Sequence, residues 1–195
     1  MKRILLVLGA SLVLGGITHV AQGLLPDALR PFANSASGWT VLTALMVWWS
    51  RKTGWRAAAL GAASFVLLVA GYTVVSSLRG YTYNPLLFGV VGVVVGPFVG
   101  LAAAWLRERG YRGAAGTALV AGIGIGEGVY GLTTVRETTG ASYWVAATVA
   151  GVLLLGAMLW RRLRGVGPWT VALGGTGVVA VAFVVAYRML GGVGG

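Results

Sequence analysis

Seven apolar segments, each about 20 residues long, constrain the fold of this chain more than any other feature of its sequence. Their approximate bounds are 4–25, 32–49, 55–78, 86–106, 114–132, 143–160 and 169–187. An α-helix needs about 20 residues to cross the hydrocarbon core of a bilayer, and each segment reaches or approaches that length. The pattern predicts an all-α fold, a polytopic membrane helix bundle of about seven transmembrane helices. It also predicts a single transmembrane helical domain over residues 1–190 and a flexible Gly-rich tail at residues 191–195.

Lysine and arginine are concentrated in alternate turns between these segments. If all seven segments cross and the N-terminus is cytoplasmic, the inside carries eleven basic residues, Lys2, Arg3, Arg51, Lys52, Arg56, Arg107, Arg109, Arg112, Arg161, Arg162 and Arg164. The outside then carries four, Arg30, Arg79, Arg136 and Arg188. Cytoplasmic turns are enriched in basic residues, so this split predicts a cytoplasmic N-terminus. If segment 32–49 returned to its starting side, the split would become 5 inside and 10 outside, so the same rule predicts that it crosses.

The composition excludes several kinds of site. A net charge of +11 would favour nucleic acid in a soluble protein, but these charges lie in short turns, and we predict no nucleic-acid partner. A chain without cysteine has no disulfides and no thiolate chemistry, and one histidine cannot form a multi-histidine metal or haem site. Both lysines, Lys2 and Lys52, lie next to helix ends, which excludes a mid-helix retinal Schiff base. We predict no cofactor and no metal.

The first segment is similar to a secretory signal peptide because it begins Met-Lys-Arg. It continues for some 22 residues, however, and reaches Gln22 to Pro26 without a clear small-residue cleavage site. We interpret it as a retained helix, with cleavage as the alternative.

A short motif repeats at the predicted cytoplasmic turns. Trp-x-Arg-x-x-Gly occurs at residues 49–54, 105–110 and 160–165, so the copies lie 56 and 55 residues apart. One interpretation is an internal duplication, in which one helix precedes three two-helix hairpins. The other is that any short cytoplasmic turn favours an interfacial aromatic residue, an arginine and a capping glycine.

The positions of glycine within the predicted helices indicate how the helices pack. Gly92, Gly96 and Gly100 recur at four-residue spacing beside Pro97, which predicts a kink and a close approach of a neighbouring helix backbone. Glycine also occurs at alternate positions around Glu127, which indicates either tight packing or a broken helix whose carbonyls line a cavity.

All eight tryptophans fall at or near segment ends, as in interfacial aromatic belts, and we assign none to ligand stacking.

Polar residues of the apolar segments gather near the predicted outer ends of the helices. Glu127 is the only carboxylate inside an apolar segment, and such a group is functional, a structural hydrogen-bonding residue, or simply exposed to water. It shares a helix face with Tyr130, as His19 does with Gln22. We predict a polar pocket open to the outside and closed below by apolar residues. Its substrate-binding residues are His19, Gln22, Asn34, Ser35, Tyr72, Glu127 and Tyr130.

Several motifs of the chain are similar to those of a known family. They are Thr18-x-x-Ala21-Gln22-x-Leu24-Leu25-Pro26 with Leu29 and Ala33-Asn34-Ser35-x-x-x-Trp39, then Gly96-Pro97-x-x-Gly100-x-x-Ala103-x-Trp105, and Gly126-Glu127-Gly128. Over roughly residues 10–135 the chain resembles a family of small, uncharacterised actinobacterial multi-pass membrane proteins, a domain of unknown function. The resemblance implies a bacterial inner (plasma) membrane and no particular activity. The abundance of Arg, Ala, Val and Gly agrees with a GC-rich genome.

Three functions fit these observations. The first, which we favour, is binding or transport of a small polar or cationic solute from the outside, with Glu127 as the charged or proton-coupling group. The second is a structural or accessory subunit that docks onto a membrane protein partner or forms a homo-oligomer in the lipid bilayer. The third is a membrane enzyme that acts on a lipid headgroup, with His19 and Glu127 as an acid and base pair. No catalytic motif supports the third, so we predict no catalytic residue and no enzyme activity.

Overall fold

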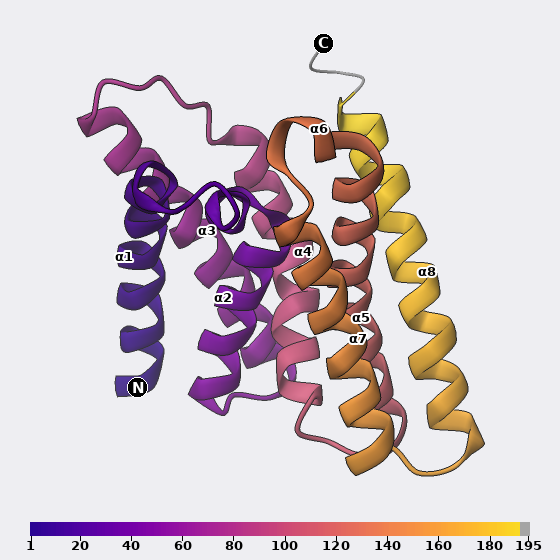
Figure 1. The fold of residues 1–195 in the computed structure, drawn as a ribbon. Coiled ribbons are helices and arrows are strands. Elements are labelled where there is room, and N and C mark those ends of the chain that lie inside the picture. Colours follow the sequence, from indigo (N-terminus) through magenta and orange to yellow (C-terminus); the bar gives the residue numbers. More distant parts are fainter. Residues whose placement is uncertain (192–195) are drawn as a thin grey trace. The chain divides into compact units, whose positions relative to one another are not determined.

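The computed structural model describes residues 1–191, and every regular element in that range is a helix (Figure 1). Seven of these helices have 15 or more residues: α1 (Lys2–Leu24), α2 (Ala36–Ser50), α3 (Gly54–Leu78), α4 (Leu86–Trp105), α5 (Gly110–Tyr130), α7 (Ser142–Arg161) and α8 (Val166–Gly191). The shorter elements are the 3₁₀-helix η1 (Arg30–Asn34), the π-helix η2 (Gly131–Val135) and α6 (Arg136–Thr139). The predicted all-α bundle is confirmed. Of the predicted tail, Gly191 ends α8, and residues 192–195 lie outside the described residues.

Six helical segments of residues 1–191 are long and apolar enough to cross a membrane. The α5 segment continues through η2 and α6, so its candidate span runs over Gly110–Thr139. Of the seven long helices, only α2 is too short to cross. Its 15 residues rise about 22 Å, which is less than the thickness of the hydrocarbon core. The structure therefore indicates a multi-pass membrane protein with six helices of spanning length and one shorter helix.

The chain forms two compact units. The first unit holds Met1–Pro26 and Arg30–Ala104, and therefore α1, η1, α2, α3 and nearly all of α4. The second unit holds Asp27–Leu29 and the chain from Trp105 onward, and therefore α5, η2, α6, α7 and α8.

Glycines bring α1 and α3 of the first unit into backbone contact. A Cβ atom on Gly15 would collide with the backbone carbonyl of Leu68, and one on Gly71 would collide with the backbone of α1. Membrane helices approach this closely when small residues lie at the contact. The same contact places the hydroxyl oxygens of Ser11 and Ser64 2.7 Å apart, where they share a hydrogen bond.

The glycines of α4 face α3, also within the first unit. A Cβ atom on Gly96 would lie 2.7 Å from the Cα atom of Ala62, and one on Gly100 would collide with the carbonyl oxygen of Ala57. A Cβ atom on Gly92 would meet a phenylalanine ring at 3.0 Å. The predicted close approach of a neighbouring backbone is confirmed at Gly96 and Gly100, whereas the close contact of Gly92 is with a side chain.

In the second unit, the glycines of α5 alternate between two partner helices. A Cβ atom on Gly122 or Gly126 would collide with residues of α8, and one on Gly128 would collide with residues of α7. One on Gly124 would lie 3.3 Å from a carbonyl oxygen of α7. The backbone stays α-helical through this stretch and takes up π-helical geometry only after Tyr130. The glycine-rich sequence around Glu127 therefore serves tight packing, which was the first of the two alternatives.

The glycine of each Trp-x-Arg-x-x-Gly motif adopts a left-handed backbone conformation. The φ angle is +56° at Gly54, +67° at Gly110 and +91° at Gly165, where α3, α5 and α8 begin. Glycine adopts these angles at little cost because it has no Cβ atom. This shared turn geometry accounts for the glycine of the motif whether or not the three copies arose by duplication.

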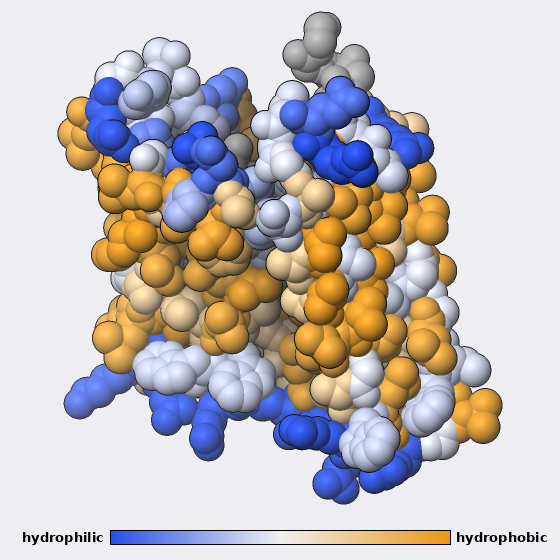
Figure 2. Space-filling view, in the orientation of Figure 1, coloured by the Kyte–Doolittle hydropathy of each residue, from blue (hydrophilic) through white to orange (hydrophobic). Residues whose placement is uncertain are grey.

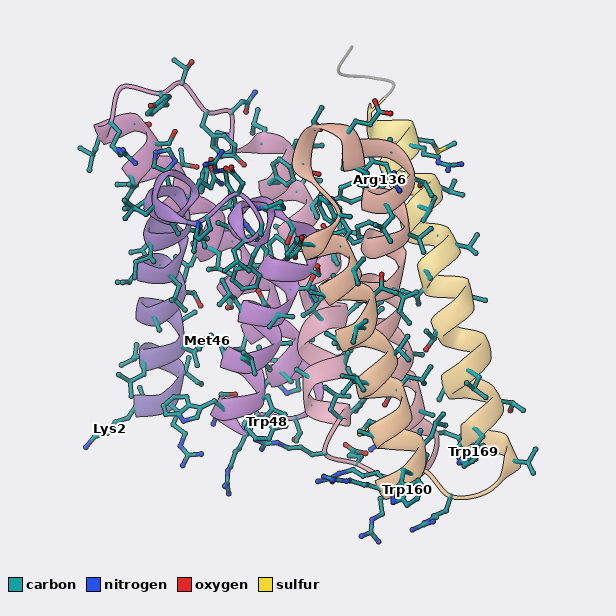
Figure 3. The ribbon with its side chains drawn as sticks, viewed as in Figure 1. Lys2, Met46, Trp48, Arg136, Trp160 and Trp169 are labelled. Carbon is teal, nitrogen blue, oxygen red and sulfur yellow. The ribbon has the colours of Figure 1, made fainter. Side chains whose placement is uncertain are left out.

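In each unit, most of the lysine and arginine residues lie at one end, which we call its basic end. In the first unit it carries Lys2, Arg3, Arg51, Lys52 and Arg56, and the opposite end carries Arg30 and Arg79. In the second unit it carries Arg107, Arg109, Arg112, Arg161, Arg162 and Arg164, and the opposite end carries Arg136 and Arg188. Figure 2 shows hydrophobic surface between the two hydrophilic ends of each unit. Figure 3 places Lys2 and Trp48 at the basic end of the first unit, and Trp160 and Trp169 at that of the second.

Two tryptophans are buried within their units instead of lying in an interfacial belt. Trp39 is 7% exposed, and its indole N–H donates to the carbonyl oxygen of Ala33 at 3.4 Å. Trp144 is 6% exposed, lies against Gly131, and donates to the hydroxyl of Thr139 at 2.8 Å. The prediction that all eight tryptophans form interfacial belts is wrong for these two. Each indole has a hydrogen-bond acceptor inside its own unit, so it does not need the water of the membrane interface.

Candidate functional site

A cavity of about 580 Å³ lies at the end of the first unit opposite its basic end. We call it the polar cavity, and its walls come from α1, η1, α3 and the segment that follows α3. Its lining residues are His19, Gln22, Gly23, Arg30, Tyr72, Ser76, Arg79, Tyr81, Thr82 and Tyr83. On each helix the cavity lies next to a glycine contact. The last contact glycines are Gly16 on α1 and Gly71 on α3, and the larger side chains of His19 and Tyr72 lie beyond them and line the cavity.

The segment after α3 folds back over the end of that helix. The backbone N–H of Gly80 donates to the carbonyl of Ser77, and that of Tyr81 donates to the carbonyl of Ser76, each at 3.0 Å. Together with a φ angle of +79° at Gly80, these bonds form a Schellman motif, the usual glycine-dependent helix terminus. As a result, the ring centroid of Tyr81 lies 5.7 Å from that of His19 on α1.

A hydrogen-bonded chain connects two lining residues of the polar cavity, Gln22 and Tyr72, to neighbouring helices. Tyr72 donates from its hydroxyl to Oε1 of Gln22 at 3.2 Å, and Nε2 of Gln22 donates to the carbonyl oxygen of Ala33 at 3.3 Å. The indole of Trp39 donates to the same carbonyl oxygen. These bonds join α1, η1, α2 and α3, so the polar groups at this end of the first unit position one another.

His19 lies beside this hydrogen-bonded chain but takes no part in it. Its side chain is 8% exposed, and neither Nδ1 nor Nε2 has a hydrogen-bond partner. The ring lies edge-on between Tyr72, at a centroid distance of 5.0 Å, and Tyr81. A buried polar group without a partner costs about 1–3 kcal/mol, so packing alone gives no reason for a histidine here. Tyr81 is 60% exposed, and both it and His19 line the cavity.

Aromatic rings form a second wall. The ring of Tyr83 meets that of Tyr72 edge-on at 4.8 Å and stacks with that of Phe88 at 6.4 Å. Burial, together with the neighbouring Tyr72, raises the pKa of Tyr83 to about 12. Its hydroxyl therefore stays protonated at physiological pH and can donate a hydrogen bond.

The charge of the lining is positive. Arg30 and Arg79 are the two basic residues at this end of the first unit, and both line the polar cavity. Among the residues that line it, none carries a carboxylate. Arginine and tyrosine side chains present hydrogen-bond donors, so the lining is suited to oxygen acceptors and negative charge.

The structure brings together three of the predicted site residues, since His19, Gln22 and Tyr72 line one cavity. Ser35 has a different role there. Its hydroxyl caps α2 by accepting from the N–H of Gly38 at 2.9 Å, and it is not among the lining residues. Asn34 ends η1, and its side chain lies outside the described part of the structure.

Glu127 and Tyr130 belong to α5 in the second unit. Glu127 is 3% exposed and lies one residue beyond the tightly packed Gly126. The ring of Tyr130 meets that of Tyr187 on α8 edge-on at 5.4 Å, and Tyr187 stacks on Phe183 at 4.3 Å. The predicted grouping of these two residues with His19 stays a prediction.

Reasoning from the sequence missed the contribution of residues 79–83. Arg79, Tyr81 and Tyr83 all line the polar cavity, yet they lie outside the apolar segments on which the prediction was based. The available signal was a loop with an arginine and two tyrosines directly after an apolar helix, with a glycine placed to reverse the chain.

Comparison with known proteins identifies the family of the chain. No curated protein and no solved structure matches the chain. A family model described as a family of unknown function, DUF6518, matches residues 1–192. This match agrees with the predicted resemblance to an uncharacterised family, whereas the actinobacterial origin stays a prediction. Because it covers almost the whole sequence, the chain belongs to the family of unknown function DUF6518.

Proposed function

We propose that the protein lies in the bacterial inner membrane and binds a small polar solute in the polar cavity of its first unit. In this proposal the basic ends face the cytoplasm and the polar cavity opens to the outside. The supporting observation is His19, a buried imidazole whose two nitrogens have no partner beside a cavity of about 580 Å³. A bound solute would supply the missing hydrogen bond.

The lining supports an anionic solute instead of the cationic one favoured by the sequence. Arg79, with the hydroxyls of Tyr81 and Tyr83, offers hydrogen-bond donors, and the lining holds no carboxylate that would balance a cation. An oxyanion would accept from these donors and from a protonated nitrogen of His19. Transport of that solute across the membrane stays a prediction.

Binding is better supported than catalysis. His19 is the only lining residue whose ordinary pKa lies near neutrality, and acid–base catalysis on a headgroup needs a second group that exchanges a proton. The docking of partner membrane proteins likewise stays a prediction.

Thermal unfolding of the detergent-purified protein tests the proposal. Inorganic phosphate and acetate, added against sodium chloride of equal ionic strength, should raise the melting temperature, and choline should not. Arg79→Gln should reduce this response. Arg136→Gln should leave the response intact, because Arg136 is an exposed arginine of the second unit, at the end opposite that unit's basic end. The proposal is wrong if no anion stabilises the protein, or if both variants respond equally.

A further inference from the structure

An apolar groove of about 410 Å³ runs between α1 and α3 of the first unit. Its lining residues are Leu12, Val13, Gly16, Ile17, Val20, Gly71, Val74 and Val75. Gly71 lies against the backbone of α1, and Gly16 lies against the side chain of Val75, so the two helices are in close contact where these glycines line the groove. The side chains along its rim are largely uncovered, with 61% of Val13, 52% of Ile17 and 55% of Val74 exposed.

The groove and the polar cavity adjoin each other along the same helix pair. On α1 the groove extends to Val20 and the cavity begins at His19, and on α3 Gly71 lines the groove while Tyr72 lines the cavity. On α1 the groove covers eight helical steps, or about 12 Å, on the side of the cavity that lies nearer the middle of the span. The polar, positively charged cavity thus adjoins the apolar groove: the groove extends further toward the middle of α1, and on α3 the two hollows occupy different faces at the same level.

We propose that these two hollows hold one molecule, an anionic lipid whose phosphate-bearing headgroup lies in the polar cavity and whose acyl chain lies in the groove. This inference rests on the proposed function and names the class of its solute. The positive lining favours the phosphate, and His19 and Arg79 donate hydrogen bonds to its oxygens. A zwitterionic headgroup would place an ammonium group beside Arg79, and no lining residue carries a carboxylate to balance it.

The groove distinguishes a lipid from a free phosphate. A soluble anion would fill the polar cavity and make no specific contact with the groove. A lipid is delivered from the bilayer itself, so its headgroup reaches the cavity at a high effective concentration. The acyl chain gains little from leaving other lipid chains, and its contribution is the close packing that a groove of fixed shape provides.

The test uses the full-length protein in a mild detergent and measures stabilisation by phosphatidylglycerol, phosphatidylcholine and the soluble phosphodiester glycerophosphoglycerol. Val74→Trp fills the groove, and Val94→Trp is its control, because Val94 is a similarly exposed valine on α4, 57% exposed, that lines neither hollow. We expect phosphatidylglycerol to stabilise the protein at about tenfold lower concentration than phosphatidylcholine, a difference of about 1.4 kcal/mol. Val74→Trp should abolish this preference for the lipid and leave the response to glycerophosphoglycerol, whereas Val94→Trp should change neither.

The outcomes separate the two proposals. If glycerophosphoglycerol acts as well as phosphatidylglycerol and Val74→Trp has no effect, the lipid assignment is wrong and the solute proposal stands. Equal stabilisation by the two lipids also contradicts the lipid assignment. If neither the lipids nor the soluble anions stabilise the protein, both proposals fail.

Discussion

The hydroxyl of Tyr72 on α3 donates a hydrogen bond to the side-chain oxygen of Gln22 on α1, across 3.2 Å. The amide nitrogen of the same glutamine donates to the carbonyl oxygen of Ala33 in η1, which connects α1 and α2. One side chain therefore links α1, α3 and η1 beside the polar cavity. The stability of this end of the first unit and the geometry of its cavity depend on the same bond.

A double-mutant cycle should detect this link. Tyr72→Phe and Gln22→Met each remove one partner and keep most of the side-chain volume. Interhelical hydrogen bonds in membrane proteins contribute about 0.6 kcal/mol on average, so we expect a coupling free energy of about that size. Reversible unfolding in mixed micelles measures it. Strictly additive effects would show that the two side chains do not interact in the folded protein.

Replacing His19 should separate stability from binding. In His19→Phe the ring stays between Tyr72 and Tyr81, while the two buried nitrogens without partners are removed. We expect the free energy of unfolding to rise by about 1–3 kcal/mol and the stabilisation by phosphate to disappear. Thermal unfolding with and without phosphate measures both effects.

The matched variant for this prediction is His19→Ala, which removes the nitrogens and also the ring. It should lower stability, because it leaves a space in a packed cluster. A His19→Phe protein that is less stable than the wild type would show instead that the imidazole is satisfied in the native membrane protein.

Gly80 provides a test of the loop that covers His19. At a φ angle of +79°, Gly80→Ala should cost about 1–2 kcal/mol and displace Tyr81 from the imidazole. Gly140→Ala is the control, because Gly140 has a φ angle of +73° in the second unit and its Cβ position is equally free of neighbours. Both variants should lose stability, but only Gly80→Ala should weaken the response to anions. Equal binding by the two variants would exclude the loop from the site.

The helices were predictable from the sequence because apolar length and charged turns are local properties. The bounds of α3, for example, differ from the apolar segment 55–78 by one residue at its start. The predicted bounds 32–49 were less accurate, because residues 30–34 form a 3₁₀-helix and α2 begins only at Ala36. Ser35 illustrates the reason. Its capping bonds to Phe32 and Gly38 divide one apolar stretch into two elements, and hydropathy does not register a cap.

The site was less predictable, because its residues come together through packing. His19, Gln22 and Tyr72 were found by their polarity and their depth in the helices. Their partner Tyr81 reaches the site only because the chain reverses at Gly80. The expected sign of the solute charge came from Glu127, the one carboxylate in an apolar segment, whereas the polar cavity is lined by arginine.

The close contact of α1 and α3 predicts different effects for two glycines. Gly71→Ala should destabilise the protein by about 1–3 kcal/mol, because the added methyl group collides with the backbone of Leu12. Gly174→Ala in α8 adds the same methyl group where no atom lies within 4 Å, and it should be neutral or stabilise the helix by up to about 1 kcal/mol. Unfolding free energies of the two variants test this. A tolerated Gly71→Ala would contradict the described contact of the two helices.

The proposed orientation in the membrane can be tested with single cysteines, because the natural chain has none. Thr82 lines the polar cavity at one end of the first unit, and Thr53 precedes α3 at the basic end. Both threonines are exposed, and no hydrogen bond to the helix end is made by the Thr53 side chain, so cysteine should be tolerated at either position. A membrane-impermeant maleimide should label Thr82→Cys in intact cells or spheroplasts, whereas Thr53→Cys should react only after the membrane is opened. The reverse pattern would place the polar cavity on the cytoplasmic side, and its lipid would then come from the inner leaflet.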